Sequence, residues 1–159
     1  MLPVLTTNFI RWDAISLHYQ RTDAPMRLTL EMRVSGGSDM ILAPQRGNKY
    51  GTCSIEALTT PITPQADWQS FMQQLINKWA SYKSDSGELL NIRPHWAKSW
   101  NGFTVRGKPT EQYLKEDAYK EARVEFVNNM SGIVQKRGIT VEETLARFGN
   151  PLLKRLFFE

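Results

Sequence analysis

Two short segments of this 159-residue chain hold residue types that could do chemistry. The first is Glu31-Met32-Arg33, in which a carboxylate and a guanidinium stand two positions apart. On a β-strand such residues point to the same side, roughly 6.5–7 Å apart, while the residue between them points to the other. The two charged side chains could therefore hold a polar ligand from two directions. The alternative is an ordinary ion pair on a solvated sheet face.

The second segment is residues 93–98, Arg-Pro-His-Trp-Ala-Lys. Its proline has no N–H to give to a strand ladder, so we expect a strand to end there and a loop to follow. Loops at strand ends often carry binding and catalytic residues. Lys98 in such a loop could stabilise negative charge or act as a base. The alternative is a Trp96 anchor with solvated neighbours, in which His95 only makes structural hydrogen bonds.

Strands must position both segments. Residues 27–34 alternate between polar and apolar side chains, which predicts a half-buried strand carrying Glu31 and Arg33. A second strand is expected over residues 52–60 and a third over residues 88–94, where the proline of the second segment ends it.

Helices are expected between and after these strands. Apolar side chains recur at helical spacing from Trp68 to Trp79, which predicts an amphipathic helix, and a longer helix is expected over residues 111–136. Thr140 and Glu143 form a capping box for a short last helix, which the Gly-Asn-Pro run at 149–151 breaks. The order predicts an α+β fold, an antiparallel or mixed sheet with helices packed on one face. Residues 1–26 are expected to be an irregular segment before a domain at 27–159.

Composition and motifs exclude several classes of protein. Scattered basic residues and a net charge of +4 argue against a nucleic-acid partner. No apolar run is long enough for a transmembrane segment and no signal peptide is seen, so we expect a cytoplasmic or membrane-associated protein. Two histidines and the single Cys53 leave no zinc cluster, and no metal is expected. No glycine-rich phosphate-binding motif is present.

The two segments, in this order and about sixty residues apart, resemble the C-terminal half of the aldonolactone oxidases, flavoproteins of the vanillyl-alcohol oxidase superfamily. Cap domains of that family carry a Glu-x-Arg strand and a later Arg-Pro-His-Trp-Gly-Lys segment, whose glycine is Ala97 here. The C-terminal end is also similar to theirs, and the resemblance spans residues 27–158. Residues 33–36 are similar to the flavin-linked cholesterol oxidases of the same superfamily as well. The family's pattern near its C-terminus is matched by Phe148, Asn150, Leu153 and Phe157.

The resemblance implies the substrate-binding cap of an FAD-dependent oxidase that acts on CH–OH groups of a sugar lactone or polyol, in the manner of the D-arabinono-1,4-lactone oxidases. It implies that Arg33 stabilises negative charge where flavin and substrate meet, while Glu31 binds substrate hydroxyls and orients Arg33. Lys98 would approach the reacting hydroxyl as a charge stabiliser or a proton acceptor. His95 and Trp96 would shape the substrate-binding loop. The alternatives are a cholesterol oxidase-type substrate-binding domain and a non-catalytic binding module that retains the cap fold.

In that family FAD is bound mainly by an N-terminal half that precedes the cap, and we expect this half to be absent from the chain. The implied partners are a flavin-binding domain or subunit and a small-molecule alcohol or lactone. We therefore expect the isolated chain neither to bind FAD tightly nor to oxidise alcohols. The absorbance spectrum of the purified chain is the measurement, and a yellow sample with one flavin per chain would contradict the expectation.

Overall fold

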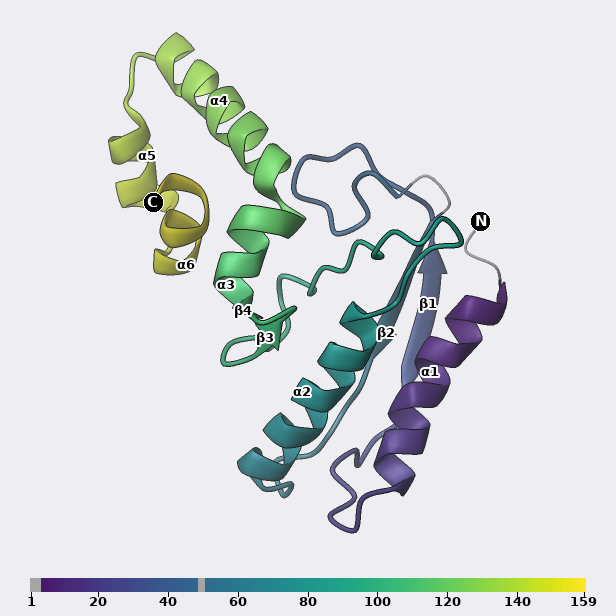
Figure 1. Ribbon diagram of the computed structural model, residues 1–159. Helices are drawn as coiled ribbons and strands as arrows, with labels where there is room; N and C mark the ends of the chain where they lie inside the picture. The colour runs from purple at the N-terminus through teal and green to yellow at the C-terminus, as the bar shows by residue number, and fades with distance from the viewer. Residues whose placement is uncertain (1–3, 49–50) are drawn as a thin grey trace.

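A computed structural model describes residues 4–48 and 51–159 of the chain. It has the predicted α+β character, with helices and two small antiparallel sheets. The first sheet is a two-stranded ribbon of β1 (Glu31–Ser35) and β2 (Thr52–Glu56). The helices α1 (Val4–Tyr19) and α2 (Gln65–Ala80) lie alongside this ribbon (Figure 1).

The register of the ribbon decides which side chains share a face. Glu31 is directly opposite Glu56, and Arg33 is directly opposite Ser54. Residues that face each other across antiparallel strands point to the same side of the sheet. The polar face of the ribbon therefore carries these four residues.

The second sheet is a short hairpin that the sequence reading missed. Its strands are β3 (Thr104–Val105) and β4 (Lys108–Pro109). Arg106 and Gly107 form the turn, with φ of 52° and 78°. Positive φ at both central residues is the mark of a type I′ hairpin turn, and an arginine is an uncommon choice for the first of them. Without the usual Asn-Gly or Asp-Gly signal, sequence gives little warning of this hairpin.

From residue 110 onward the chain is mostly helical (Figure 1). The predicted long helix over 111–136 is broken at Tyr119, which leaves helical geometry with φ −126° and ψ 17°. Before that break, the α-helix passes into a π-turn at Leu114. The capping box of Thr140 and Glu143 is confirmed, as is the break after α5. The C-terminal elements in chain order are α3 (Thr110–Tyr113), the π-turn η1 (Leu114–Ala118), α4 (Lys120–Lys136), α5 (Val141–Phe148), α6 (Pro151–Leu153) and the π-turn η2 (Lys154–Phe158).

The two predicted strands of the ribbon are shorter than expected, because β1 does not include residues 27–30 and β2 does not include residues 57–60. Two further predictions about the elements were wrong. The irregular segment expected over residues 1–26 contains the helix α1, which contacts α2. Its sequence shows no clear apolar period, so contact with α2 is what favours the helix over an irregular chain. The strand expected over residues 88–94 is a loop, in which Leu89 makes a single bridge to Lys83. Backbone carbonyls of this loop accept hydrogen bonds from side chains and not from a neighbouring strand. Arg106 donates to the Leu90 carbonyl, and the Tyr113 hydroxyl donates to the Ile92 carbonyl.

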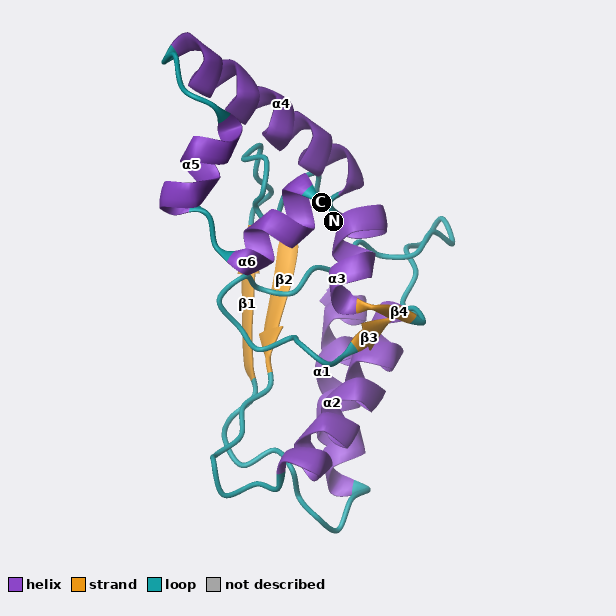
Figure 2. Ribbon diagram, turned by 90° about the vertical axis from the view of Figure 1, so that its left-hand side faces the viewer, coloured by secondary structure: helices purple, strands orange, loops and turns teal. Residues whose placement is uncertain are grey.

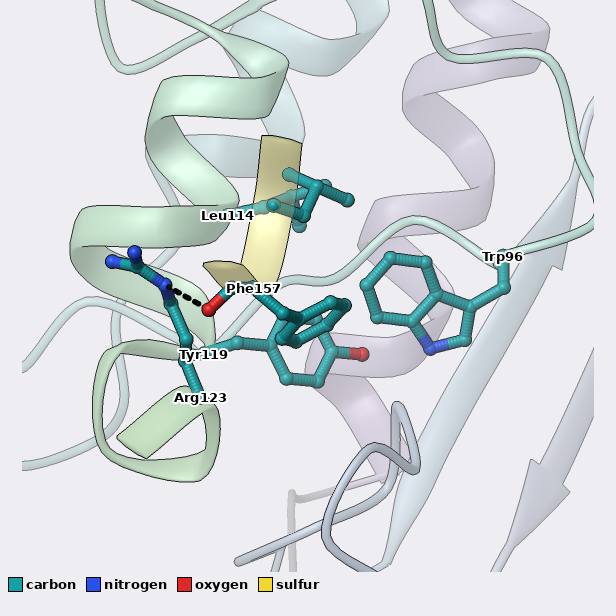
Figure 3. A pocket seen from close by; sticks show the side chains of 6 residues that line it. Trp96, Leu114, Tyr119, Arg123 and Phe157 are labelled. Carbon is teal, nitrogen blue, oxygen red and sulfur yellow. Dashed lines mark hydrogen bonds between the residues drawn. The ribbon is translucent and has the colours of Figure 1, made fainter. Parts of the chain in front are cut away.

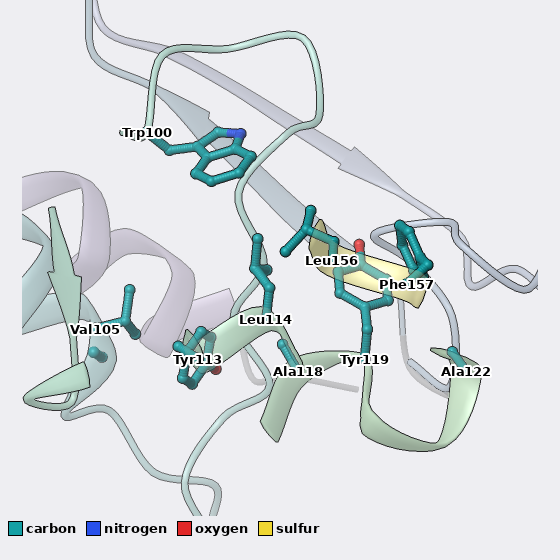
Figure 4. Close-up of a cluster of buried hydrophobic side chains, with 10 residues drawn as sticks. Trp100, Val105, Tyr113, Leu114, Ala118, Tyr119, Ala122, Leu156 and Phe157 are labelled. Atoms are coloured by element: carbon teal, nitrogen blue, oxygen red, sulfur yellow. The ribbon is translucent and has the colours of Figure 1, made fainter. Parts of the chain in front are cut away.

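Two apolar clusters hold these elements together. The first gathers buried side chains from α2, β3 and the C-terminal helices, among them Tyr113, Leu114, Tyr119 and Phe157 (Figure 4). The second lies between α1 and α2 around Ala14, Phe71 and Leu75. Leu30 and Ala57, the neighbours of Glu31 and Glu56 in the chain, pack against the second cluster. One end of the ribbon is thus fixed against the helix pair, which steadies the two carboxylates there.

A polar contact also joins α1 to the end of α2. Asp13 is buried, and its carboxylate accepts a hydrogen bond from the Tyr82 hydroxyl at 2.6 Å and forms an ion pair with the Lys78 ammonium at 2.9 Å. Burial, together with the contact to Asp13, raises the pKa of Tyr82 to about 12. The protonated hydroxyl is therefore the form that the folded chain stabilises.

This raised pKa predicts a loss of stability at alkaline pH. The contribution of Tyr82 should be complete below a pH of about 10, the ordinary pKa of tyrosine, and should be lost as pH rises toward 12. The free energy of unfolding should be measured for the wild type and for Tyr82→Phe from pH 8 to 11.5. The wild type should be the more stable below pH 10, and its advantage should shrink above it. An advantage that stays constant over the whole range would contradict this reading.

Candidate functional site

The Glu31–Arg33 pair lies on the polar face of the ribbon. The Arg33 guanidinium donates to the Glu31 carboxylate at 2.7 Å, and the two side chains are 76% and 42% exposed. An exposed pair of this kind contributes only about 0–1 kcal/mol to stability. Its value to a ligand is the open presentation of a donor and an acceptor side by side on a strand.

Lys98 arrives at the same face from a distant part of the chain. The loop that leads into β3 crosses the two strands of the ribbon (Figure 2), and the Lys98 ammonium forms an ion pair with Glu56. Glu56 is the residue directly opposite Glu31. Opposed Cα atoms in an antiparallel ladder are about 4.5–5.5 Å apart. The structure therefore brings together Glu31, Arg33 and Lys98, three residues that the sequence singled out for separate reasons.

Glu56 is a member of this group that sequence reasoning missed. The hydrogen bond from Lys98 lowers the pKa of its carboxyl group, with smaller contributions from the charges of Lys98, Arg33 and His95 and a partial offset from burial. The only signal in the sequence is that Ser54 and Glu56 are polar at alternate positions of an expected strand. That pattern does not say which residue of β1 Glu56 will face.

Trp96 is an anchor between the loop and the core. Its indole N–H donates to the Leu42 carbonyl at 2.8 Å, and its ring lies 4.9 Å from that of Tyr119 and 6.1 Å from that of Phe157 (Figure 3). These are the anchoring contacts that the sequence left open as an alternative to substrate binding. A loop fixed at Trp96 limits how far Lys98, two residues later, can move.

His95 shapes the turn that leads to Lys98. Its Nδ1 accepts a hydrogen bond from the Ala97 amide at 3.1 Å, and its carbonyl accepts one from the Lys98 amide at 3.0 Å. The side chain is exposed, and it lies close enough to Glu56 to influence that carboxyl group. The structure thus places His95 beside the charged group, within a local turn.

Arg93 holds the segment in place from inside the protein. Its guanidinium donates to the carbonyls of Arg46 at 2.8 Å and Ala118 at 3.0 Å, and it stacks 4.6 Å from the centre of the Tyr119 ring. Longer hydrogen bonds reach Pro44 and Ala43. Among the residues that the structure describes, no carboxylate pairs with it. Removal from water lowers the pKa of Arg93, although an arginine stays charged at neutral pH.

Neither of the two clearest cavities of the structure lies on the polar face of the ribbon, which carries Glu31 and Arg33 and is called the charged face below. The enclosed space beside Trp96, Tyr119 and Phe157 is too small for water (Figure 3). An open hollow of about 510 Å³ lies on the C-terminal helices, beside Pro151 and Arg155. Glu31, Arg33 and Lys98 line neither of them. A ligand on the ribbon face would need a second wall from another domain or chain.

Within residues 4–48 and 51–159, no three histidine, cysteine or acidic side chains gather where they could hold a metal ion. No helix there is both long and apolar enough to cross a membrane.

Comparison of the chain with protein-family models, curated proteins and solved structures found no match. The residues and their arrangement therefore carry the functional argument.

The contacts of Arg93 predict a large cost when its planar fork is lost. Arg93→Lys keeps the charge but cannot reach carbonyls on two segments at once. Since hydrogen bonds from charged groups are worth about 1.5–3 kcal/mol, the free energy of unfolding should fall by about that much. Chemical unfolding is the measurement, with Arg137→Lys as the matched control at an exposed arginine. Equal effects of the two substitutions would show that Arg93 is not an anchor.

Proposed function

We propose that this chain is the substrate-binding part of an FAD-dependent oxidase that acts on a CH–OH group of a sugar lactone or polyol. The observation that supports the proposal is the meeting of Glu31 and Arg33 with Lys98 on one exposed face. The spacing of Lys98 from Glu31 and Arg33 in the sequence does not predict that it lies on this face. The similarity of both segments to the aldonolactone oxidases gives that meeting its chemical interpretation.

The donor set fits the chemistry that oxidation of an alcohol requires. When bound, the flavin supplies the acceptor for the hydride that leaves the substrate carbon. Arg33 offers guanidinium N–H groups to negative charge that develops on the substrate oxygen or on the flavin ring. Glu31 accepts hydrogen bonds from substrate hydroxyls and keeps Arg33 in place. Lys98, paired with Glu56, adds a second cation beside the first.

The exposure of this face supports a role in which another domain or chain covers it. The Arg33 side chain is 76% exposed and that of Lys98 57%. Preorganised charges stabilise a transition state strongly only where water is excluded. A flavin-binding domain, in the same polypeptide or a separate one, would cover this face and complete the site.

A non-catalytic binding module is the second candidate. The observation in its favour is that each cation of the face already has a carboxylate partner, as in ordinary surface ion pairs. Such a module would bind a polar ligand or a partner chain without chemistry. The kinetics of charge-removing variants separate the two candidates.

The proposal predicts unequal effects for two arginines that are close in sequence. With the flavin domain present, Arg33→Ala should lower turnover on the order of 10²–10³-fold, because a preorganised donor to developing charge is lost. Arg33→Lys should also be poor, since an ammonium cannot reproduce the planar fork.

Arg27→Ala is the matched control. Arg27 was predicted to lie in the same strand, but β1 begins at Glu31, and the exposed Arg27 donates to the Asp23 carbonyl at 3.3 Å. Its loss should change turnover little. Small and equal effects at both arginines would overturn the catalytic reading and leave the binding module.

A further inference from the structure

The position of Lys98 raises the question of what fixes its ammonium. The residue comes from a loop, so no strand ladder holds its side chain, which is 57% exposed. Local contacts fix only its backbone, through the turn closed on the His95 carbonyl. A lysine side chain has four rotatable bonds and a strongly hydrated head, and it does not stay in one place without a partner. The partner that the structure gives this ammonium is Glu56.

We propose that Glu56 is a positioning residue, whose carboxylate holds the Lys98 ammonium over the β1–β2 face beside the Glu31–Arg33 pair. The inference rests on the function proposed above and deepens it. It assigns Lys98 the part of a fixed cation, where the sequence allowed either a charge stabiliser or a proton acceptor. Glu56 itself acts only through Lys98.

The backbone of Glu56 is suited to this task. It is paired across the ladder with Glu31, and its neighbour Ala57 packs against the cluster between α1 and α2. Its side chain is 29% exposed, the least of the four charged groups on this face. A carboxylate held at a strand end by packing gives a mobile lysine a fixed point.

The charges around Glu56 keep it ionised. The contact with Lys98, followed by the charges of Arg33 and His95, lowers the pKa of Glu56, so its carboxylate remains charged at neutral and mildly acidic pH.

The two cations and the two carboxylates on this face also offset one another's charge. Glu31 and Glu56 are directly opposed, and like charges in that position repel across a sheet. Arg33 offsets one carboxylate and Lys98 the other. Without the Glu56 charge, the Lys98 ammonium would lose the partner that the structure gives it and would turn toward water, while Arg33 keeps its own partner Glu31. Loss of Glu56 should thus move Lys98 and leave the Glu31–Arg33 pair intact.

The first experiment observes Lys98 directly and needs no activity. The chain is labelled with ¹³C and ¹⁵N in its lysine side chains, and the order of the Lys98 ammonium is measured by NMR relaxation. Glu56→Gln, which keeps shape and removes charge, should make Lys98 as mobile as the other exposed lysines. Glu88→Gln, at an exposed site away from the ribbon, is the control and should change nothing. Unchanged order of Lys98 in Glu56→Gln would overturn the proposal.

The second experiment tests whether Glu56 acts through Lys98. In the complex with the flavin domain, and with D-arabinono-1,4-lactone as the probe substrate, Glu56→Gln should lower kcat on the order of tenfold to hundredfold, because a displaced catalytic group costs about that much. In a Lys98→Ala background the same substitution should have no further effect. A full additional loss in that background would overturn the positioning role.

The two experiments separate this inference from the function on which it rests. If Arg33→Ala leaves turnover unchanged while Glu56→Gln frees Lys98, the oxidase proposal fails and the contact that holds Lys98 stands. If Arg33→Ala abolishes turnover while Glu56→Gln neither frees Lys98 nor lowers kcat, the oxidase proposal stands and the role of Glu56 falls.

Discussion

The guanidinium of Arg93 joins three parts of the chain that no regular structure connects. It donates to Arg46 in the loop between β1 and β2 and to Ala118 at the end of η1, and it stacks on Tyr119 where the helix breaks. A half-buried arginine can satisfy backbone carbonyls with charge-assisted hydrogen bonds and needs no carboxylate partner to do so. Both the broken helix and the path of the following loop depend on this contact. The position of Lys98 in turn depends on that loop.

The charged face is held in place by two sets of contacts, one to the ribbon and one to the loop that carries Lys98. A two-stranded ribbon is marginal by itself, so its end is steadied by Leu30 and Ala57 against the helix pair. Loop 93–98 is steadied by the Trp96 anchor. The two supports meet in the ion pair of Lys98 with Glu56, which closes a group of alternating charges. Each pair is weak in water, and the group would gain strength only under a cover that excludes it.

Much of the local structure could be predicted because its causes are local. The alternation around Glu31 and Arg33 predicts a strand whose two charged side chains share a face. Apolar spacing predicts α2, and the capping box of Thr140 and Glu143 predicts the start of α5. The α+β character follows from the same patterns. Where neighbours far along the chain decide, as in α1 and the loop over residues 88–94, the predictions were wrong.

The sequence by itself determined which residues carry charge on the face of β1 and which loop bears a lysine. Only the tertiary structure decided that Lys98 reaches that face, that Glu56 stands opposite Glu31, and that Trp96 turns toward Tyr119. The physical reason is that strand register and loop path are set by the sum of contacts between distant segments. A shift of register by one residue would put Glu56 on the other face without changing any local pattern.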